Sequence, residues 1–207
     1  MKTIQKYKIK AVIIFIALIA SASVTFGVYR PKVASGSDKL FQNDLGKIKI
    51  TVFPTIVRSF NWTIYDHSSS KRIGTFFETN NLAKVHYSDK KIEMNKSTAK
   101  IQWQLFKKSM SLFADYLKVH PVNTEYALVV ECLVTSRRSG GEAVGGIQCY
   151  LLDSKGNNAF SFLLNSHHKL FIDAQLKTNN ATTESRDELI KKSTEVVIKA
   201  FQRQLNI

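Results

Sequence analysis

Three segments of alternating apolar and polar residues follow one another between Glu125 and Phe171, and they constrain the fold more than any other feature of the chain. The predicted strands are 125–135, 143–153 and 159–171, and the turn-rich sequences RRSGGE and SKGNN connect them. Alternate residues share one apolar face, namely Tyr126, Leu128, Val130, Cys132, Val134, Ile147, Cys149, Leu151, Phe160, Phe162 and Leu164. We expect an antiparallel meander with a buried face.

Two long helical patterns lie on either side of the meander in sequence. The central helix is predicted from about Thr98 to Val119, before Pro121, and its apolar arc covers roughly 200°. The last helix is predicted over 185–205, with Ser185 and Glu188 as a capping box. A first strand, KIKITVF, precedes a proline that ends it or forces it to a sheet edge. The fold class is therefore α/β (α+β), with a mixed, mostly antiparallel sheet packed by a central and a C-terminal helix.

The region 58–95 is the least regular part of the pattern. The sequence SSSKRIGTFFETNN is compatible with a short helix, and 82–87 with a short strand.

Residues 1–30 have the pattern of a targeting segment. The basic stretch MKTIQKYKIK precedes the apolar run AVIIFIALIA, and Ala20-Ser21-Ala22 has the form of a signal-peptidase site, with cleavage after Ala22. The alternative is an uncleaved signal anchor over 11–29, about 28 Å long as a helix. No cysteine lies near the end of the segment, which excludes a lipid anchor there. Both readings export the domain, because lysines before the apolar run are retained in the cytoplasm.

The targeting segment sets the expected domain organisation. We expect a signal peptide or anchor over 1–30, a linker over 31–46 and a single extracytoplasmic domain over 47–207, in the periplasm or held at the inner membrane by residues 11–29.

The chain is strongly basic. Lys and Arg number 30 against 16 Asp and Glu, which gives a net charge of +14. This excess attracts anionic surfaces such as envelope polymers or lipid headgroups. Arg137 and Arg138, at the predicted hairpin tip, are the candidate contact residues, and a merely solubilising tip is the alternative.

The two cysteines lie on neighbouring predicted strands. If Gly140-Gly141 forms a two-residue turn, Cys132 lies directly opposite Cys149 in a non-hydrogen-bonded pair, close enough for a disulfide. An oxidising compartment would preserve that bond. The alternative is two free buried thiols, which result if a bulge changes the register.

Catalytic and metal-binding motifs are weak in this sequence. Ser68 and Lys71 match S-x-x-K, but Lys177-Thr178-Asn179 lacks the glycine of the accompanying K-T-G, so a polar turn is favoured. His167 and His168 are adjacent in a predicted strand and would point to opposite faces. We predict no catalytic residues, no metal site and no cofactor.

The order of elements resembles a known family. The first strand KIKITVFP, the hairpin sequences EYALVVECLV and GGIQCYLLDSKGNNAF and the two helices are similar to the αβ domain of periplasmic proteins of the TolB amino-terminal and curli-secretion-lipoprotein type, over residues 47–205. The missing lipid-anchor cysteine departs from the lipoprotein members. The resemblance implies an envelope scaffold or assembly role without catalysis.

Three functions follow as hypotheses. The first is a non-catalytic binding or assembly module of the bacterial cell envelope, whose partner is an envelope protein or an anionic surface. The second is a basic domain that binds anionic envelope polymer or lipid headgroups. The third is a small secreted hydrolase that uses Ser68, Lys71 or a histidine. The membrane is a partner at the N-terminus if the signal is uncleaved, and no nucleic-acid partner is expected.

Overall fold

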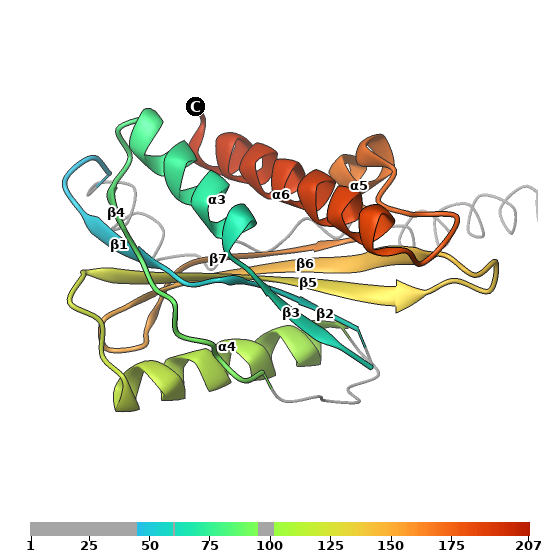
Figure 1. Ribbon diagram of the computed structural model, residues 1–207. Helices are drawn as coiled ribbons and strands as arrows, with labels where there is room; N and C mark the ends of the chain where they lie inside the picture. The colour runs from blue at the N-terminus through green and yellow to red at the C-terminus, as the bar shows by residue number, and fades with distance from the viewer. Residues whose placement is uncertain (1–44, 60, 95–101) are drawn as a thin grey trace, which may run out of the picture. The chain divides into compact units, whose positions relative to one another are not determined.

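The computed structural model describes residues 45–59, 61–94 and 102–207, which form a seven-stranded mixed sheet and four helices (Figure 1). The expected fold class is confirmed. In chain order the elements are β1 (Lys49–Val52), β2 (Thr55–Arg58), β3 (Thr63–Asp66), α3 (His67–Thr79), β4 (Lys84–Tyr87), α4 (Gln102–Val119), β5 (Tyr126–Ser136), β6 (Glu142–Asp153), β7 (Asn158–Asn165), α5 (Lys169–Ala174) and α6 (Thr183–Leu205).

The long strand β5 organises the sheet. On one side it pairs antiparallel with β6, which pairs antiparallel with β7. On the other side it pairs in parallel with both β1 and β2, which follow one another along it. Beyond them, β4 is parallel to β1 and β3 is antiparallel to β2. Pro54 separates β1 from β2 as predicted, and both segments are internal to the sheet.

Helices cover both faces of the sheet. Figure 1 shows α3 and α6 on one face and α4 on the other. Alternate residues of β5 therefore enter two different cores: Leu128 and Val130 pack under α3 and α6, whereas Ala127 and Val129 pack under α4. The sequence pattern indicated only the first of these faces.

Aromatic rings dominate the core under α3 and α6. The ring of Phe201 on α6 lies 5.0 Å from that of Phe77 on α3 and 5.3 Å from that of Phe162 on β7, measured between ring centroids. Each fully buried side chain of this size contributes about 1.5–3 kcal/mol relative to an exposed one. These contacts hold α3 and α6 against one face of the sheet.

The last predicted strand is shorter in the structure than the sequence indicated. The strand expected over 159–171 ends at Asn165, and α5 follows it. His168 is the N-cap of α5, where its Nδ1 accepts a hydrogen bond from Leu170 N at 3.3 Å, so the two histidines lie in a turn and not in a strand. Leu170 and Phe171 are buried, which explains why their apolar character imitated a strand.

Helix α6 begins one turn earlier than its predicted capping box. Thr182 is the N-cap, and its hydroxyl accepts from Ser185 N at 3.2 Å while Ser185 Oγ accepts from Thr182 N at 3.0 Å. The box is therefore Thr182 with Ser185, and the predicted Ser185–Glu188 box was wrong.

The β5–β6 hairpin has a longer loop than predicted. Ser136 pairs with Glu142, so residues 137–141 form the loop, closed by Arg137 N donating to Gly141 O at 2.7 Å. A Cβ on Gly141 would lie 2.0 Å from Thr178 O, so the close approach of a second segment requires glycine there.

The register of this hairpin keeps the two cysteines from facing each other. A bulge at Gly145 shifts the pairing between Leu133 and Val134, and beyond it Cys132 lies opposite Ile147 while Cys149 lies opposite Val130. The net offset from the predicted register is two residues, so both thiols stay on one face as diagonal neighbours, at a typical Cα separation of about 7–8 Å. The predicted register was wrong, and both cysteines are buried and free in the structure.

The predicted targeting signal over 1–30 and most of the linker lie outside the described residues. In the part of the chain that the structure describes, no helix combines the length and the apolar character needed to cross a membrane.

Candidate functional site

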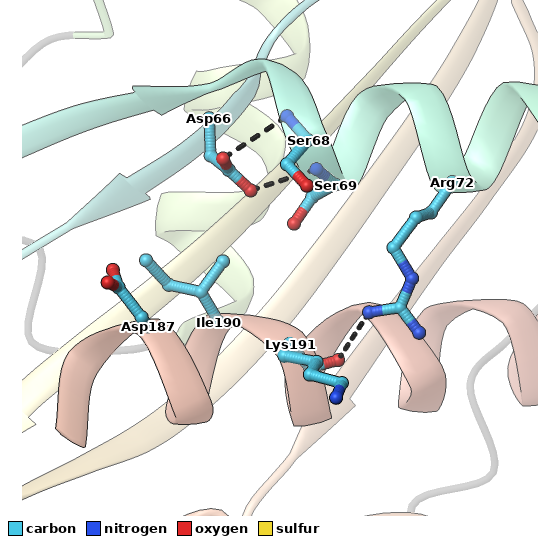
Figure 2. A pocket seen from close by; sticks show the side chains of 7 residues that line it. All are labelled: Asp66, Ser68, Ser69, Arg72, Asp187, Ile190 and Lys191. Atoms are coloured by element: carbon cyan, nitrogen blue, oxygen red, sulfur yellow. Dashed lines mark hydrogen bonds between the residues drawn. The ribbon is translucent and has the colours of Figure 1, made fainter. Parts of the chain in front are cut away.

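One candidate site is a cleft of about 510 Å³ between the start of α3 and the first half of α6 (Figure 2). It includes Ser68, the first residue of the S-x-x-K motif. Its lining residues are Asp66, Ser68, Ser69, Arg72, Asp187, Ile190 and Lys191.

Asp66 and Ser69 of this α3–α6 cleft, and Ser70 beside it, make hydrogen bonds that stabilise the fold. The Asp66 carboxylate caps α3 by accepting from Ser68 N at 3.2 Å and Ser69 N at 2.9 Å. The Ser69 hydroxyl is buried against that of Thr194 on α6, with 2.6 Å between the oxygens. The Ser70 hydroxyl donates to His67 O at 2.9 Å.

The arginine of the cleft also joins the two helices. Figure 2 shows Arg72 reaching from α3 to the backbone of α6, where Nη1 donates to Lys191 O at 3.4 Å. Its Nη2 lies 3.3 Å from a carboxylate oxygen of Glu195. Asp66, Ser69 and Arg72 of the cleft thus cap α3 or join it to α6.

The catalytic pair of the hydrolase hypothesis does not meet. Ser68 borders the cleft, whereas Lys71 is exposed and does not line it. Among the described residues, no hydrogen bond joins the Ser68 hydroxyl to a lysine or a histidine.

The histidines are likewise dispersed. His67 lies 3.6 Å from Asp89, with both side chains exposed, and burial followed by the charge of Arg203 lowers the pKa of the capping His168. A search of the described residues finds no cluster of three or more side chains able to hold a metal ion.

The two arginines of the predicted hairpin tip have different environments. Arg137 is half-buried, and its Nη1 donates to Thr178 O at 2.7 Å, which ties the tip to the segment before α6. Arg138 is exposed. Of the two residues, only Arg138 presents its guanidinium freely for an anionic contact.

A second candidate site lies beside the β2–β3 hairpin. This β2–β3 groove has a volume of about 730 Å³, within the range of about 300–1,000 Å³ typical of small-molecule sites. Its lining residues are Arg58, Asn61, Trp62, Thr63, Tyr65, Glu93 and Met94.

A buried polar cluster adjoins the β2–β3 groove. The Nε of Arg58, at the end of β2, bonds to Oε1 of Glu131, in the middle of β5. Glu131 is fully buried and pairs in register with Gln148 of β6, whose amide oxygen accepts from the Tyr150 hydroxyl. Burial raises the pKa of Glu131, and the charge of Arg58 offsets this only in part.

Three polar atoms in this cluster are buried and have no hydrogen-bond partner among the described residues: Nη2 of Arg58, Oε2 of Glu131 and Nε2 of Gln148. Buried polar groups are almost always bonded in folded proteins, so three exceptions in one place are unusual.

The two aromatic side chains that line the groove, Trp62 and Tyr65, contact residues that do not line it. The Arg186 guanidinium carbon lies 4.7 Å from the centroid of the Trp62 ring, and Glu142 fixes this guanidinium with two hydrogen bonds of 2.8 and 2.9 Å. The Tyr65 hydroxyl donates to Ile92 O at 3.1 Å. These contacts restrict the positions of both rings.

Sequence reasoning missed this second site. One signal was present: Glu131 is the only charged residue within the apolar stretch YALVVECLV, and a charge on a buried strand indicates a partner. Arg58 and Trp62 gave no comparable signal, because the region around them has no clear periodicity.

Comparisons with known proteins are sparse. No protein-family model matches the chain, and no curated protein matches it in sequence. The solved structures similar to it include the PelC dodecamer from Paraburkholderia phytofirmans, at 14% identity and a TM-score of 0.36, over 74% of this chain and 83% of that one. They also include the LpoB C-terminal domain from Salmonella enterica, at 14% identity and a TM-score of 0.35, over 62% of this chain and 90% of that one. At TM-scores this low, neither likeness supports a conclusion about function.

Proposed function

We propose that this protein is a non-catalytic binding or assembly module of the bacterial cell envelope. The observation that carries the proposal is the bonding within the α3–α6 cleft. Asp66, Ser69 and Arg72 are all engaged in capping α3 or joining it to α6. The cleft with the best catalytic motif is therefore built as a structural joint.

The proposed location in the envelope rests on the sequence of residues 1–30. A basic, acid-free start, an apolar run and an A-x-A site are typical of export signals. An exported domain of this kind works through its surface, on a protein or a polymer outside the cytoplasm.

Site-specific photo-crosslinking in the native envelope tests this proposal. A photoreactive amino acid is placed at the exposed positions Arg138 and Ile172, near the hairpin tip and α5, and at Val119, at the far end of α4, as the matched control. We expect one stoichiometric envelope protein to be captured from some positions and not from others. Equal, diffuse capture from all three positions contradicts a dedicated partner.

A second candidate function is binding to an anionic envelope surface, favoured by the net charge of +14 and the exposed Arg138. Attraction of this kind acts through solvent and weakens as salt shortens the Debye length. Co-sedimentation with vesicles rich in phosphatidylglycerol should then fall steeply between 50 and 500 mM salt, levels that span a Debye length of roughly 14 to 4 Å. Binding that does not change with salt argues against this function.

A further inference from the structure

Strand β3 forms an edge of the sheet that lacks the usual protection of edge strands. Its sequence TIYD contains no lysine and no proline, its ladder with β2 has no bulge, and its one charged residue, Asp66, caps α3. By contrast, the edge strand β4 exposes Lys84 and His86. Proteins commonly protect an exposed edge with charged residues, above all lysine, or with proline. In a chain with 30 Lys and Arg, β3 is therefore open to pairing with another strand.

The backbone groups of two β3 residues point away from the sheet. Ser59 N donates to Trp62 O at 2.9 Å, so this pair of the β2–β3 hairpin is hydrogen-bonded. Such pairs alternate along an antiparallel ladder, so Ile64 also bonds to β2, whereas Thr63 and Tyr65 direct their N–H and C=O groups to the outer edge. Thr63 and Tyr65 also line the β2–β3 groove of about 730 Å³, so there is open space beside these groups.

This edge is complementary to itself. A second β3, placed antiparallel around a two-fold axis at Ile64, brings Thr63 of each copy opposite Tyr65 of the other. The outward groups of these two residues then form a hydrogen-bonded pair on each side of the axis. A β-branched residue opposite an aromatic one is also a favourable cross-strand pair.

The side chains and charges of the edge fit the same arrangement. Ile64 is 37% exposed, and at the axis it would face its own copy in a non-hydrogen-bonded pair, where Cα atoms lie about 4.5 Å apart. Trp62 would be the diagonal neighbour of the second Ile64. Asp66 would lie opposite the second Trp62, so no like charges face each other. Self-association of a chain with a net charge of +14 requires such an uncharged contact.

We propose that β3 pairs antiparallel with β3 of a second copy of this chain, with Ile64 at the two-fold axis, so that the two sheets become continuous. The inference goes beyond the proposed function, because it assigns a self-association surface to the domain. Since β3 has 4 residues, the contact is small and the association is reversible.

Cysteine crosslinking in the native membrane fraction tests the register of this pairing. Ile64→Cys places two thiols opposite each other within disulfide range, and we expect a covalent dimer on mild oxidation. Thr63→Cys, also exposed, is the matched control, because its two copies would be diagonal and about 7–8 Å apart between Cα atoms. Ile172→Cys, exposed on α5, controls for random collision. Both controls should give at least about fivefold less dimer.

Sedimentation velocity of the full-length chain in mild detergent measures the association itself. We expect a shift from monomer to dimer between about 1 and about 500 µM, the range of weak reversible contacts. Ile64→Lys removes the apolar contact and places two lysines opposite each other, so the dissociation constant should rise about tenfold. Ile172→Lys adds the same charge at another exposed position and should leave it within about twofold. Circular dichroism checks that both variants are folded.

Three results overturn the inference: a monomer over the whole concentration range, equal dimer yields from the three cysteine variants, or an unchanged dissociation constant for Ile64→Lys. A disulfide that joins position 64 to a different envelope protein also overturns it, because β3 then takes a foreign strand. If Ile64→Cys gives no dimer while one envelope protein is captured from Arg138 or Ile172, self-pairing fails and the proposed function stands. If the dimer forms and no envelope protein is captured, the β3 surface stands and the proposed partner fails.

Discussion

The buried Arg58–Glu131 pair has a predictable pH dependence at the scale of single residues. Burial raises the pKa of Glu131 above its ordinary value of 4.5, so the folded protein holds this proton more tightly than the unfolded chain does. Stability contributed by the protonated form is present at low pH and is lost as pH rises above about 4.5 toward the folded pKa. We therefore expect the free energy of unfolding of the native chain to fall with rising pH, relative to Glu131→Gln.

Urea denaturation of both chains between pH 4 and 8 measures this difference. Glu131→Gln is the matched reference because it keeps the shape and cannot ionise. A difference that grows in favour of the native chain as pH rises would mean that the attraction of Arg58 outweighs burial.

The two thiols give a second prediction at this scale. Burial, with smaller contributions from Glu131 and Asp66, raises the pKa of Cys132 to about 12, and burial also raises the pKa of Cys149. Thiolates are the reactive form, so neither cysteine should react with an aromatic disulfide reagent at pH 8 in the folded chain. After denaturation without a reductant, 2 thiols per chain should react. Recovery of none would show that the protein carries the predicted disulfide.

Much of the residue-scale pattern was predictable. The shared face of Leu128, Val130 and Cys132 follows from strict alternation, and the structure buries all three in one core. The opposition of Cys132 and Cys149 was not predictable, because it depends on loop length and on a bulge that a glycine-rich sequence permits without specifying.

At the scale of elements, the cap of α3 is the clearest structural role in the α3–α6 cleft. Asp66→Ala removes both hydrogen bonds to Ser68 N and Ser69 N, and we expect the free energy of unfolding to fall by about 1 kcal/mol. Asp187→Ala, in the same cleft and outside any cap, is the control and should change stability by less than about 0.5 kcal/mol. Equal effects of the two changes in urea denaturation would contradict the capping role.

The long elements were predictable, and so were the short α3 and β4, which lie where a short helix and a short strand were expected, whereas β2 and β3 were not. Helices α4 and α6 and strands β5 and β6 carry sustained periodicity and lie within a few residues of their predicted bounds. Strands β2 and β3 have 4 residues each, too few to establish a period. Helix α3 buries Ser69, Ser70 and Gly74 as well as Ile73, Phe76 and Phe77, so its apolar pattern is confined to its second half.

The two candidate sites also differ in how far the sequence predicted them. The α3–α6 cleft was considered because of the S-x-x-K motif, and the motif residues Ser68 to Lys71 form the first turn of α3, which Asp66 caps. The β2–β3 groove joins residues from β2, β3 and the segment after β4, and only tertiary structure brings these together.

At the scale of the whole molecule, the proposed function depends on the compartment in which the domain lies. A sheet covered on both faces leaves function to its edges, loops and grooves, and a basic surface meets different partners on the two sides of a membrane. The partners open to the β2–β3 groove and to the exposed Arg138, and the redox state of the two thiols, depend on whether the domain is exported as predicted.

A topology reporter measures this location most directly. Alkaline phosphatase, which is active only where its disulfides form, is fused after Leu45, and a second fusion lacks residues 11–20. We expect high activity from the first fusion and background activity from the second, because the apolar run is the segment that the export machinery recognises. Background activity from both fusions would show that the chain stays in the cytosol, contradicting an envelope function.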